Sequence, residues 1–143
     1  MFAASLFTPR RAAPSRAAAY QANALEIQVA GANAHRLVTL LFEGFEQATV
    51  EARRALASGD TELKCRALTR AIRIVDEGLR AHLNLAAGGG LAQDLLELYG
   101  YVVKRLTLAN SRNDPELIAE CLRLMQPLHE AWLSIGNAPQ AQR

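Results

Sequence analysis

The sequence predicts an all-α protein: an antiparallel up-and-down bundle of four long helices with a short N-terminal helix or arm. Three observations support this fold class. Apolar residues recur with the period of a helix along most of the chain, no stretch of strand length alternates between apolar and polar residues, and the links between helical stretches are short. Short links make consecutive helices run antiparallel, as in an up-and-down bundle.

Helix-breaking and capping residues divide the chain. Gly59 is expected to end one helix, the triplet 88–90 to form a flexible turn, and Asp114 to cap a helix that starts at Pro115. Pro127 is expected to kink the last helix or to remove one of its hydrogen bonds. Helices are therefore predicted over 16–30, 34–58, 60–85, 91–111 and 115–135, with Gly31 ending the first and Asn33 capping the second.

The two ends of the chain are expected to lie outside the bundle. Residues 1–18 contain three arginines and no acidic residue, and they are predicted to be a flexible basic tail. A transit peptide has the same composition, so targeting stays open as an alternative for this segment. The ordered domain is expected over 19–136, and residues 137–143 are expected to be a disordered tail.

Composition limits the class of function. The 143 residues suit one domain, and with half of them apolar and 21% charged the chain has the composition of a folded protein. A net charge of +2 is too small to indicate nucleic-acid binding, and no apolar run reaches the roughly 20 residues of a membrane span. Cys65 and Cys121 are far apart in the sequence and are interpreted as reduced thiols in a reducing compartment.

The helix 60–85 carries two apolar stripes, about 120° apart on the helical wheel. The first contains Leu68 and Val75 and is typical of a core face. The second consists of Ala67, Ile74, Gly78, Ala81 and Leu85. Contacts with two neighbours in the bundle explain both stripes, but a groove that admits a partner helix explains the second stripe as well.

Other apolar residues also lie away from the expected core faces. Tyr101 and Leu108 lie on the side of the helix 91–111 that should face water, and Val50 lies off the stripe of the helix 34–58. Gly44, Gly78 and Gly100 lie inside helices, where glycine costs about 1 kcal/mol relative to alanine. Close helix crossings or a groove for a partner can each explain them.

No motif of enzyme chemistry is present. No glutamate has a histidine three residues later, the three histidines lack the spacing of a zinc site, and no phosphate-binding loop or G-x-S-x-G occurs. Arg53, Arg54, Arg66, Arg70 and Arg73 are interpreted as a solvated face with partners one turn away. A small helical enzyme that binds an acidic substrate stays open, and it should show a deep polar pocket lined by arginines.

Four stretches resemble one known family in order and spacing, over residues 19 to 135. They are 34-AHRLVTLLFEGFEQA-48, 67-ALTRAIRIVDEGL-79, 95-LLELYGYVVKRLTLAN-110 with 113-ND-114, and 131-AWLSI-135, preceded by 19-AYQ-21. The chain thus resembles the FliS family of flagellin-specific export chaperones. It departs from the family at Ala34, where proline is usual, at Glu43, where aspartate is usual, and at Gly100, where an acidic residue is usual.

The resemblance implies a function without catalysis. It implies a cytoplasmic chaperone that binds the C-terminal region of flagellin, prevents premature polymerisation and assists delivery to the flagellar type III export apparatus. It implies no cofactor, and an export-gate protein or an anti-sigma factor are further candidate partners. Composition and residue spacing lead us to expect no metal, no nucleic acid and no membrane insertion. The alternative is a helical adaptor or regulator that binds another amphipathic helix.

The resemblance also implies contact residues. It assigns Tyr20 to an N-terminal arm that can occupy part of the binding surface when flagellin is absent, and Phe42, Gly44, Leu98, Tyr99 and Tyr101 to shared motifs. Flagellin is then expected to cover the outward apolar residues. The candidate partner-binding residues are Tyr20, Phe42, Gly44, Val50, Ala67, Ile74, Gly78, Ala81, Leu85, Leu98, Tyr99, Tyr101 and Leu108.

Overall fold

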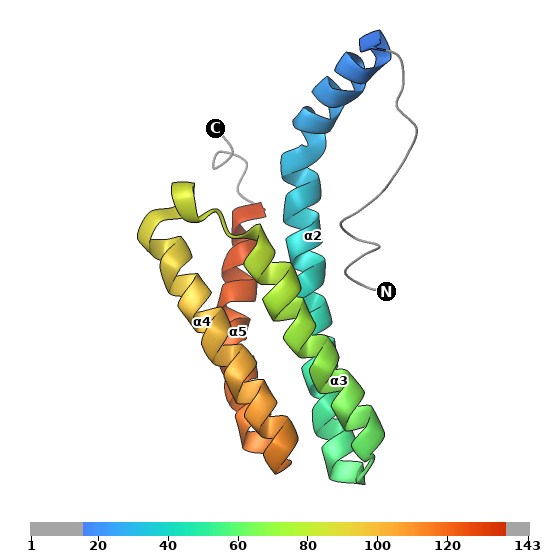
Figure 1. The fold of residues 1–143 in the computed structure, drawn as a ribbon, viewed down its shortest axis with the longest axis vertical. Coiled ribbons are helices and arrows are strands. Elements are labelled where there is room, and N and C mark those ends of the chain that lie inside the picture. Colours follow the sequence, from blue (N-terminus) through green and yellow to red (C-terminus); the bar gives the residue numbers. More distant parts are fainter. Residues whose placement is uncertain (1–15, 137–143) are drawn as a thin grey trace. The chain divides into compact units, whose positions relative to one another are not determined.

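The computed structural model describes the backbone of residues 16–136 and the side chains of residues 33–85 and 88–136 (Figure 1). The chain divides into two compact units, Met1–Leu37 and Val38–Arg143. In the first unit, the described backbone is the N-terminal part of helix α2 (Arg16–Ser58). The tails predicted before and after the bundle lie largely outside the described residues.

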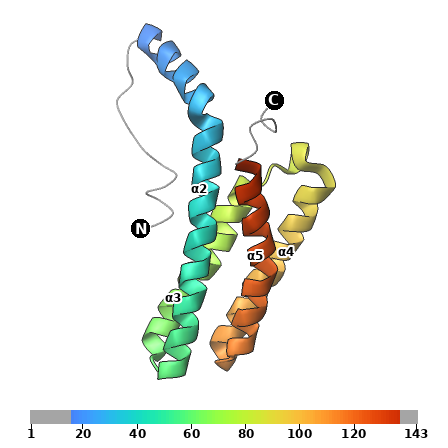
Figure 2. The ribbon, with the colours of Figure 1, turned by 180° about the vertical axis from the view of Figure 1, so that it is seen from behind.

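The second unit is an all-α bundle, as the sequence predicts, and the described residues form no strand. It consists of residues 38–58 of α2, α3 (Thr61–Arg73), the π-helical turn η1 (Ile74–Leu79), the 3₁₀ turn η2 (Arg80–His82), α4 (Leu85–Arg112) and α5 (Pro115–Gly136). The helices lie side by side in both views (Figures 1 and 2). α3 and η1 pack against α4, and α4 packs against α5.

Two of the predicted helix boundaries are confirmed in atomic detail. Gly59 follows the end of α2 with a φ of 78°, a left-handed conformation that glycine adopts without steric cost. Oδ1 of Asp60 then accepts a hydrogen bond of 3.1 Å from the backbone N–H of Leu63, which caps α3. Asp114 caps α5 in the same way, through a bond of 2.9 Å from the backbone N–H of Glu116.

The predicted break between a short N-terminal helix and the first long helix is wrong. α2 runs without interruption through Gly31 and Asn33, so Asn33 caps no helix. One glycine costs a helix only about 1 kcal/mol relative to alanine, and the surrounding segment is rich in alanine, the strongest helix former. The local signals were therefore too weak to end the helix.

The second long helix ends earlier than predicted. The backbone is extended at Leu83 (φ −78°, ψ 132°), so the helix stops at His82 and does not reach Leu85. α4 already begins at Leu85, and within the glycine triplet only Gly89 leaves the helical conformation (φ 56°, ψ −133°). The flexible turn expected over 88–90 is thus a kink at one glycine.

The core lies between α2, α3, η1, α4 and α5. Its largest fully buried side chains include Leu41, Phe45, Leu68, Ile74, Leu106, Ile118 and Met125. Pro127 lies inside α5, which continues through it even though proline has no N–H to donate. None of the helices in the described part of the chain is both long and apolar enough to cross a membrane.

Candidate partner-binding surfaces

An apolar groove of about 270 Å³ opens where α2, η1 and η2, the first half of α4 and the end of α5 meet. All residues that line it have aliphatic or aromatic hydrocarbon-rich side chains, except His82. They include Phe42, Leu91, Leu95, Tyr99, Trp132 and Ile135. This apolar groove is the kind of surface that binds the apolar face of another segment.

The base of the apolar groove is buried and its mouth is exposed. Phe42 and Tyr99 are 5% and 4% exposed, whereas Leu91 and Ile135 are 70% and 49% exposed. Burial raises the pKa of Tyr99 to about 12, so this phenol carries no charge at neutral pH. The ring of Phe42 stacks on His129, with centroids 5.3 Å apart and planes 6° apart, which connects α2 to α5.

The second stripe of the helix 60–85 is mostly buried, so its prediction as an outward surface is wrong for three residues. Ala67 and Ile74 are 3% and 0% exposed, and Gly78 is buried against Leu41. This part of the stripe packs inside the bundle, so two neighbouring helices account for both stripes there. Only Ala81 and Leu85 remain exposed.

Gly44 is also buried, and it lies close to Ile74. A Cβ atom at Gly44 would approach Cδ1 of Ile74 to 3.1 Å, so this glycine permits a close helix crossing. Close helix crossing, one of the two explanations that the sequence left open, therefore applies to Gly44 and Gly78. Neither residue presents a surface to a partner in this structure.

Tyr101 is exposed as predicted, but it belongs to a polar cluster. Its hydroxyl donates a hydrogen bond of 2.5 Å to Oε2 of Glu120, and Nε of Arg105 donates one of 2.9 Å to Oε1. The Arg105 guanidinium also lies 5.5 Å from the centre of the tyrosine ring. Leu98 and Leu108, on the same helix, are half-buried.

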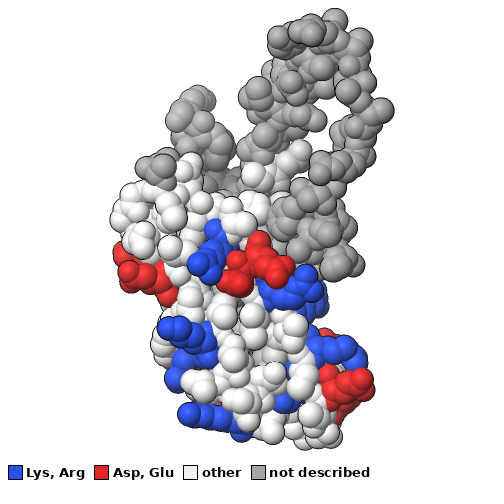
Figure 3. All heavy atoms as spheres, in the orientation of Figure 1, with Lys and Arg blue, Asp and Glu red and all other residues white. Residues whose placement is uncertain are grey.

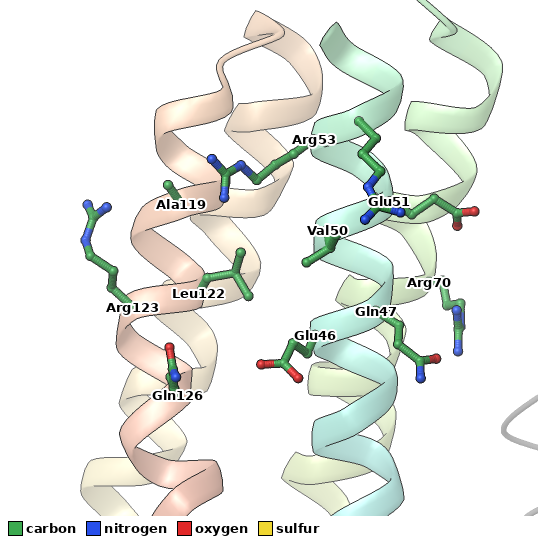
Figure 4. Close-up of a pocket in the computed structure, with 11 residues that line it drawn as sticks. Glu46, Gln47, Val50, Glu51, Arg53, Arg70, Ala119, Leu122, Arg123 and Gln126 are labelled. Atoms are coloured by element: carbon green, nitrogen blue, oxygen red, sulfur yellow. The ribbon is translucent and has the colours of Figure 1, made fainter. Parts of the chain in front are cut away.

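A second concavity separates α2 from α5, and we name it the α2–α5 hollow. It has a volume of about 850 Å³, and Val50 and Leu122 point toward one another across it (Figure 4). Arg53, Arg54, Arg70 and Arg123 line it, together with Ala119, Glu46, Gln47, Glu51 and Gln126. The helical enzyme that the sequence left open would need an arginine-lined pocket of this kind.

The sequence indicates several residues of this hollow but not that they lie together. Val50 was predicted to lie off the core face, and Arg53, Arg54 and Arg70 were predicted to be solvated. Arg123 of α5 could not be predicted to lie beside them, because helical periodicity shows the faces of each helix but not which helices pair.

The described residues include no group of three or more histidine, cysteine, aspartate or glutamate side chains that could hold a metal ion. The side chain of Tyr20 lies outside the described residues. A helical bundle whose described residues form an apolar groove belongs to the class of helical binding proteins.

Comparison with known proteins defines the family. Residues 16–139 match the family described as flagellar protein FliS. The chain is 43% identical over 118 residues to the flagellar secretion chaperone FliS of Salmonella typhimurium, which covers 82% of this chain and 87% of that protein. It is 37% identical over 114 residues to the Escherichia coli chaperone of the same name, covering 80% and 84% of the two chains.

A third relative is the flagellar secretion chaperone FliSB of Pseudomonas aeruginosa, which is 36% identical over 118 residues, with 82% of this chain and 93% of that protein covered. The chain therefore belongs to the FliS family of flagellar secretion chaperones. This is a family of chaperones and not of enzymes, which answers the enzyme alternative.

Proposed function

We propose that the protein is a cytoplasmic export chaperone that binds the C-terminal region of flagellin. In this proposal it prevents premature polymerisation of flagellin and assists its delivery to the flagellar type III export apparatus. Family membership supports the chaperone class. The structural observation that supports binding is the apolar groove, with Leu91 and Ile135 exposed at its mouth.

The mechanism is binding without chemistry. An amphipathic segment of flagellin would lay its apolar side chains over Leu91 and Ile135 and into the groove. Burial of apolar surface contributes about 25 cal/mol per Å², which offsets the entropy lost when a disordered segment becomes ordered. The apolar residues of flagellin that are held this way are then not available for self-assembly.

The structure changes which of the candidate residues we propose as direct contacts. Phe42 and Tyr99 remain, since they form the base of the groove. Ala81, Leu85, Leu98, Tyr101 and Leu108 are accessible to different degrees and remain proposed contacts outside the groove. Tyr20 remains proposed on the resemblance alone.

The experiment is a calorimetric titration of the full chain with its own organism's flagellin, both full length and lacking the C-terminal segment. We expect one-to-one binding to the full-length form only, with a large negative heat-capacity change from apolar burial. Light scattering would then show slower flagellin polymerisation in the presence of the chaperone.

Two neighbouring residues of α5 supply a matched pair of variants. Ile135 lines the groove and is 49% exposed, whereas Leu133 is 39% exposed and does not line it. We expect Ile135→Asp to weaken flagellin binding about tenfold or more and Leu133→Asp to change it little. If neither form of flagellin binds the wild-type chain, the adaptor alternative replaces this proposal.

A further inference from the structure

The α2–α5 hollow combines an apolar floor with a basic rim. Val50 of α2 faces Leu122 of α5, and Ala119 lies one turn before Leu122 (Figure 4). The guanidinium of Arg53 reaches from α2 toward α5 above them (Figure 4). Four arginines less two glutamates, Glu46 and Glu51, leave an excess of two positive charges around this floor.

Three of the four arginines of the hollow lack the partners that arginines have elsewhere on the bundle, whereas the fourth, Arg123, helps to lower the pKa of Glu120. Arg53, Arg54 and Arg70 form no ion pair or hydrogen bond through their side chains with the described residues. Arg73 and Arg80 each contact an acidic residue one turn away, at 3.4 Å and 2.7 Å. On the face shown in Figure 3, charged side chains of both signs lie beside one another.

The two concavities differ in chemistry. The apolar groove contains no arginine, and it shares no lining residue with the α2–α5 hollow. An apolar segment suits the groove, but the hollow would leave such a segment beside three arginines without partners. The hollow is complementary to an apolar stripe flanked by negative charge.

We propose that the α2–α5 hollow is a second docking site, which binds an amphipathic helix of another protein with carboxylates on both sides of a narrow apolar stripe. The stripe would contact Val50, Ala119 and Leu122. The carboxylates would pair with the arginines of the rim, and arginine suits this role because its guanidinium binds carboxylates in a bidentate geometry. This proposal goes beyond flagellin binding and is independent of the apolar groove.

One end of the hollow contains a further unpaired polar atom. A small cavity shares Glu46, Leu122 and Gln126 with the hollow and reaches His129. Nε2 of His129 is buried and has no hydrogen-bond partner among the described residues. The cavity has a volume of about 10 Å³, which is room for one water molecule and not for a side chain, so a water that bridges to the docked helix would pair this nitrogen.

The test uses the full chain and a labelled synthetic helical peptide of about 18 residues, with leucines at helical spacing and glutamates on both sides. Two control peptides have lysine in place of glutamate, or the same composition in an order that destroys the stripe. Fluorescence anisotropy measures the dissociation constants. We expect binding of the first peptide only, and weaker binding at higher salt because exposed charge pairs are screened.

Matched variants test the site. The double variant Arg53→Glu and Arg54→Glu changes two arginines of the hollow, and the control Arg66→Glu and Arg80→Glu changes two arginines outside it by the same total charge. All four side chains belong to exposed residues, so we expect both variants to fold, which circular dichroism checks. We expect peptide binding to weaken about tenfold or more in the hollow variant and about twofold or less in the control.

Three results would overturn the proposal. Equal losses in both variants would mean attraction to net charge only, and equal binding of the scrambled peptide would mean that no helical stripe is recognised. Loss of flagellin binding in the hollow variant would assign the hollow to the flagellin site. If the hollow variant loses peptide binding but keeps flagellin binding, the two sites are separate. If flagellin does not bind the wild-type chain, the proposed function is wrong, but the hollow is still tested by the peptide.

Discussion

The hydroxyl of Tyr101 on α4 donates a hydrogen bond of 2.5 Å to the carboxylate of Glu120 on α5. Arg105 donates to the other oxygen of the same carboxylate, so both oxygens are used in holding the two helices together. A tyrosine that the sequence suggested as an apolar spot is therefore also a polar connection between helices. A partner that covers the Tyr101 ring has to leave this connection intact or replace it.

The Glu120 cluster should make stability depend on pH. Hydrogen bonds from Tyr101 and then Arg105 lower the pKa of Glu120 in the folded state. A carboxylate with a lowered folded pKa stabilises the fold above its unfolded pKa, near 4.3, and this contribution is lost as pH falls through the folded pKa. We expect Glu120→Gln to lower the urea midpoint at about pH 7 and to match the wild type at about pH 2.

The effect at Glu120 should be modest because the cluster is near the surface. Glu130→Gln is a suitable control, since it changes an exposed acid of the same helix that, among the described residues, is bonded only to Gln126, at 3.5 Å. An equal difference between Glu120→Gln and the wild type at both pH values would contradict the assignment.

Two glycines inside helices should respond to alanine in opposite ways. A Cβ atom at Gly78 would lie 2.9 Å from Cδ2 of Leu41, whose side chain is fully buried, whereas a Cβ at Gly100 would meet nothing within 4 Å. We expect Gly78→Ala to destabilise by about 1–3 kcal/mol through overpacking. We expect Gly100→Ala to stabilise by up to about 1 kcal/mol through helix propensity. Urea unfolding measures both, and a stabilised Gly78→Ala variant would show that Leu41 can move aside.

The buried stripe of the second long helix gives a third prediction. Ile74 is fully buried and Leu85 is 48% exposed, although the sequence placed them on one stripe. We expect Ile74→Ala to destabilise by about 2–5 kcal/mol through lost burial and a cavity, and Leu85→Ala to have a small effect. If Ile74→Ala unfolds like the wild type, Ile74 faces outward in solution, as the sequence first suggested.

The sequence predicted the elements of the fold better than their pairing. Gly59, Asp60 and Asp114 act through neighbouring residues, so local chemistry was enough to place the helix ends there. Whether Ile74 faces the core or a partner depends on which helix packs against it, and periodicity within one helix does not contain that information. The π-helical turn at Ile74–Leu79 was likewise not predicted, because no local sequence pattern distinguished it from an α-helix.

The apolar groove was predicted only in part for the same reason. Phe42 and Tyr99 were named as partner contacts from the resemblance, but Leu91 was not among the candidate contacts. In the structure Leu91 is 70% exposed, because α4 kinks at Gly89 and the groove opens beside it. A groove is a property of several helices together, so the residues at its mouth look like core residues in the sequence.

The only buried charged side chain among the described residues is Lys64, which is 4% exposed. Its Nζ donates to the backbone oxygen of Asn110 at 3.0 Å and to Oδ1 of the same residue at 2.7 Å. We expect Asn110→Ala to destabilise by about 1–3 kcal/mol, because it removes one acceptor from a buried ammonium group. Ser111→Ala, which removes only an exposed hydroxyl bonded to Leu108, should change the urea midpoint little. Similar losses in the two variants would mean that the side-chain bond from Lys64 contributes little.

The two free cysteines should differ in reactivity. Cys121 is fully buried, and this burial raises the pKa of its thiol to about 12, whereas Cys65 is half-buried. The thiolate is the reactive form, so Cys121 should resist alkylation for two reasons: it is neither ionised nor accessible. We expect iodoacetamide to modify Cys65 alone in the native protein and both residues in urea, with peptide mass spectrometry locating the adducts. Modification of Cys121 at the rate of Cys65 under native conditions would mean that α4 and α5 separate often enough to expose the core, and the hydrogen bonds at Glu120 would then be too weak to hold them together.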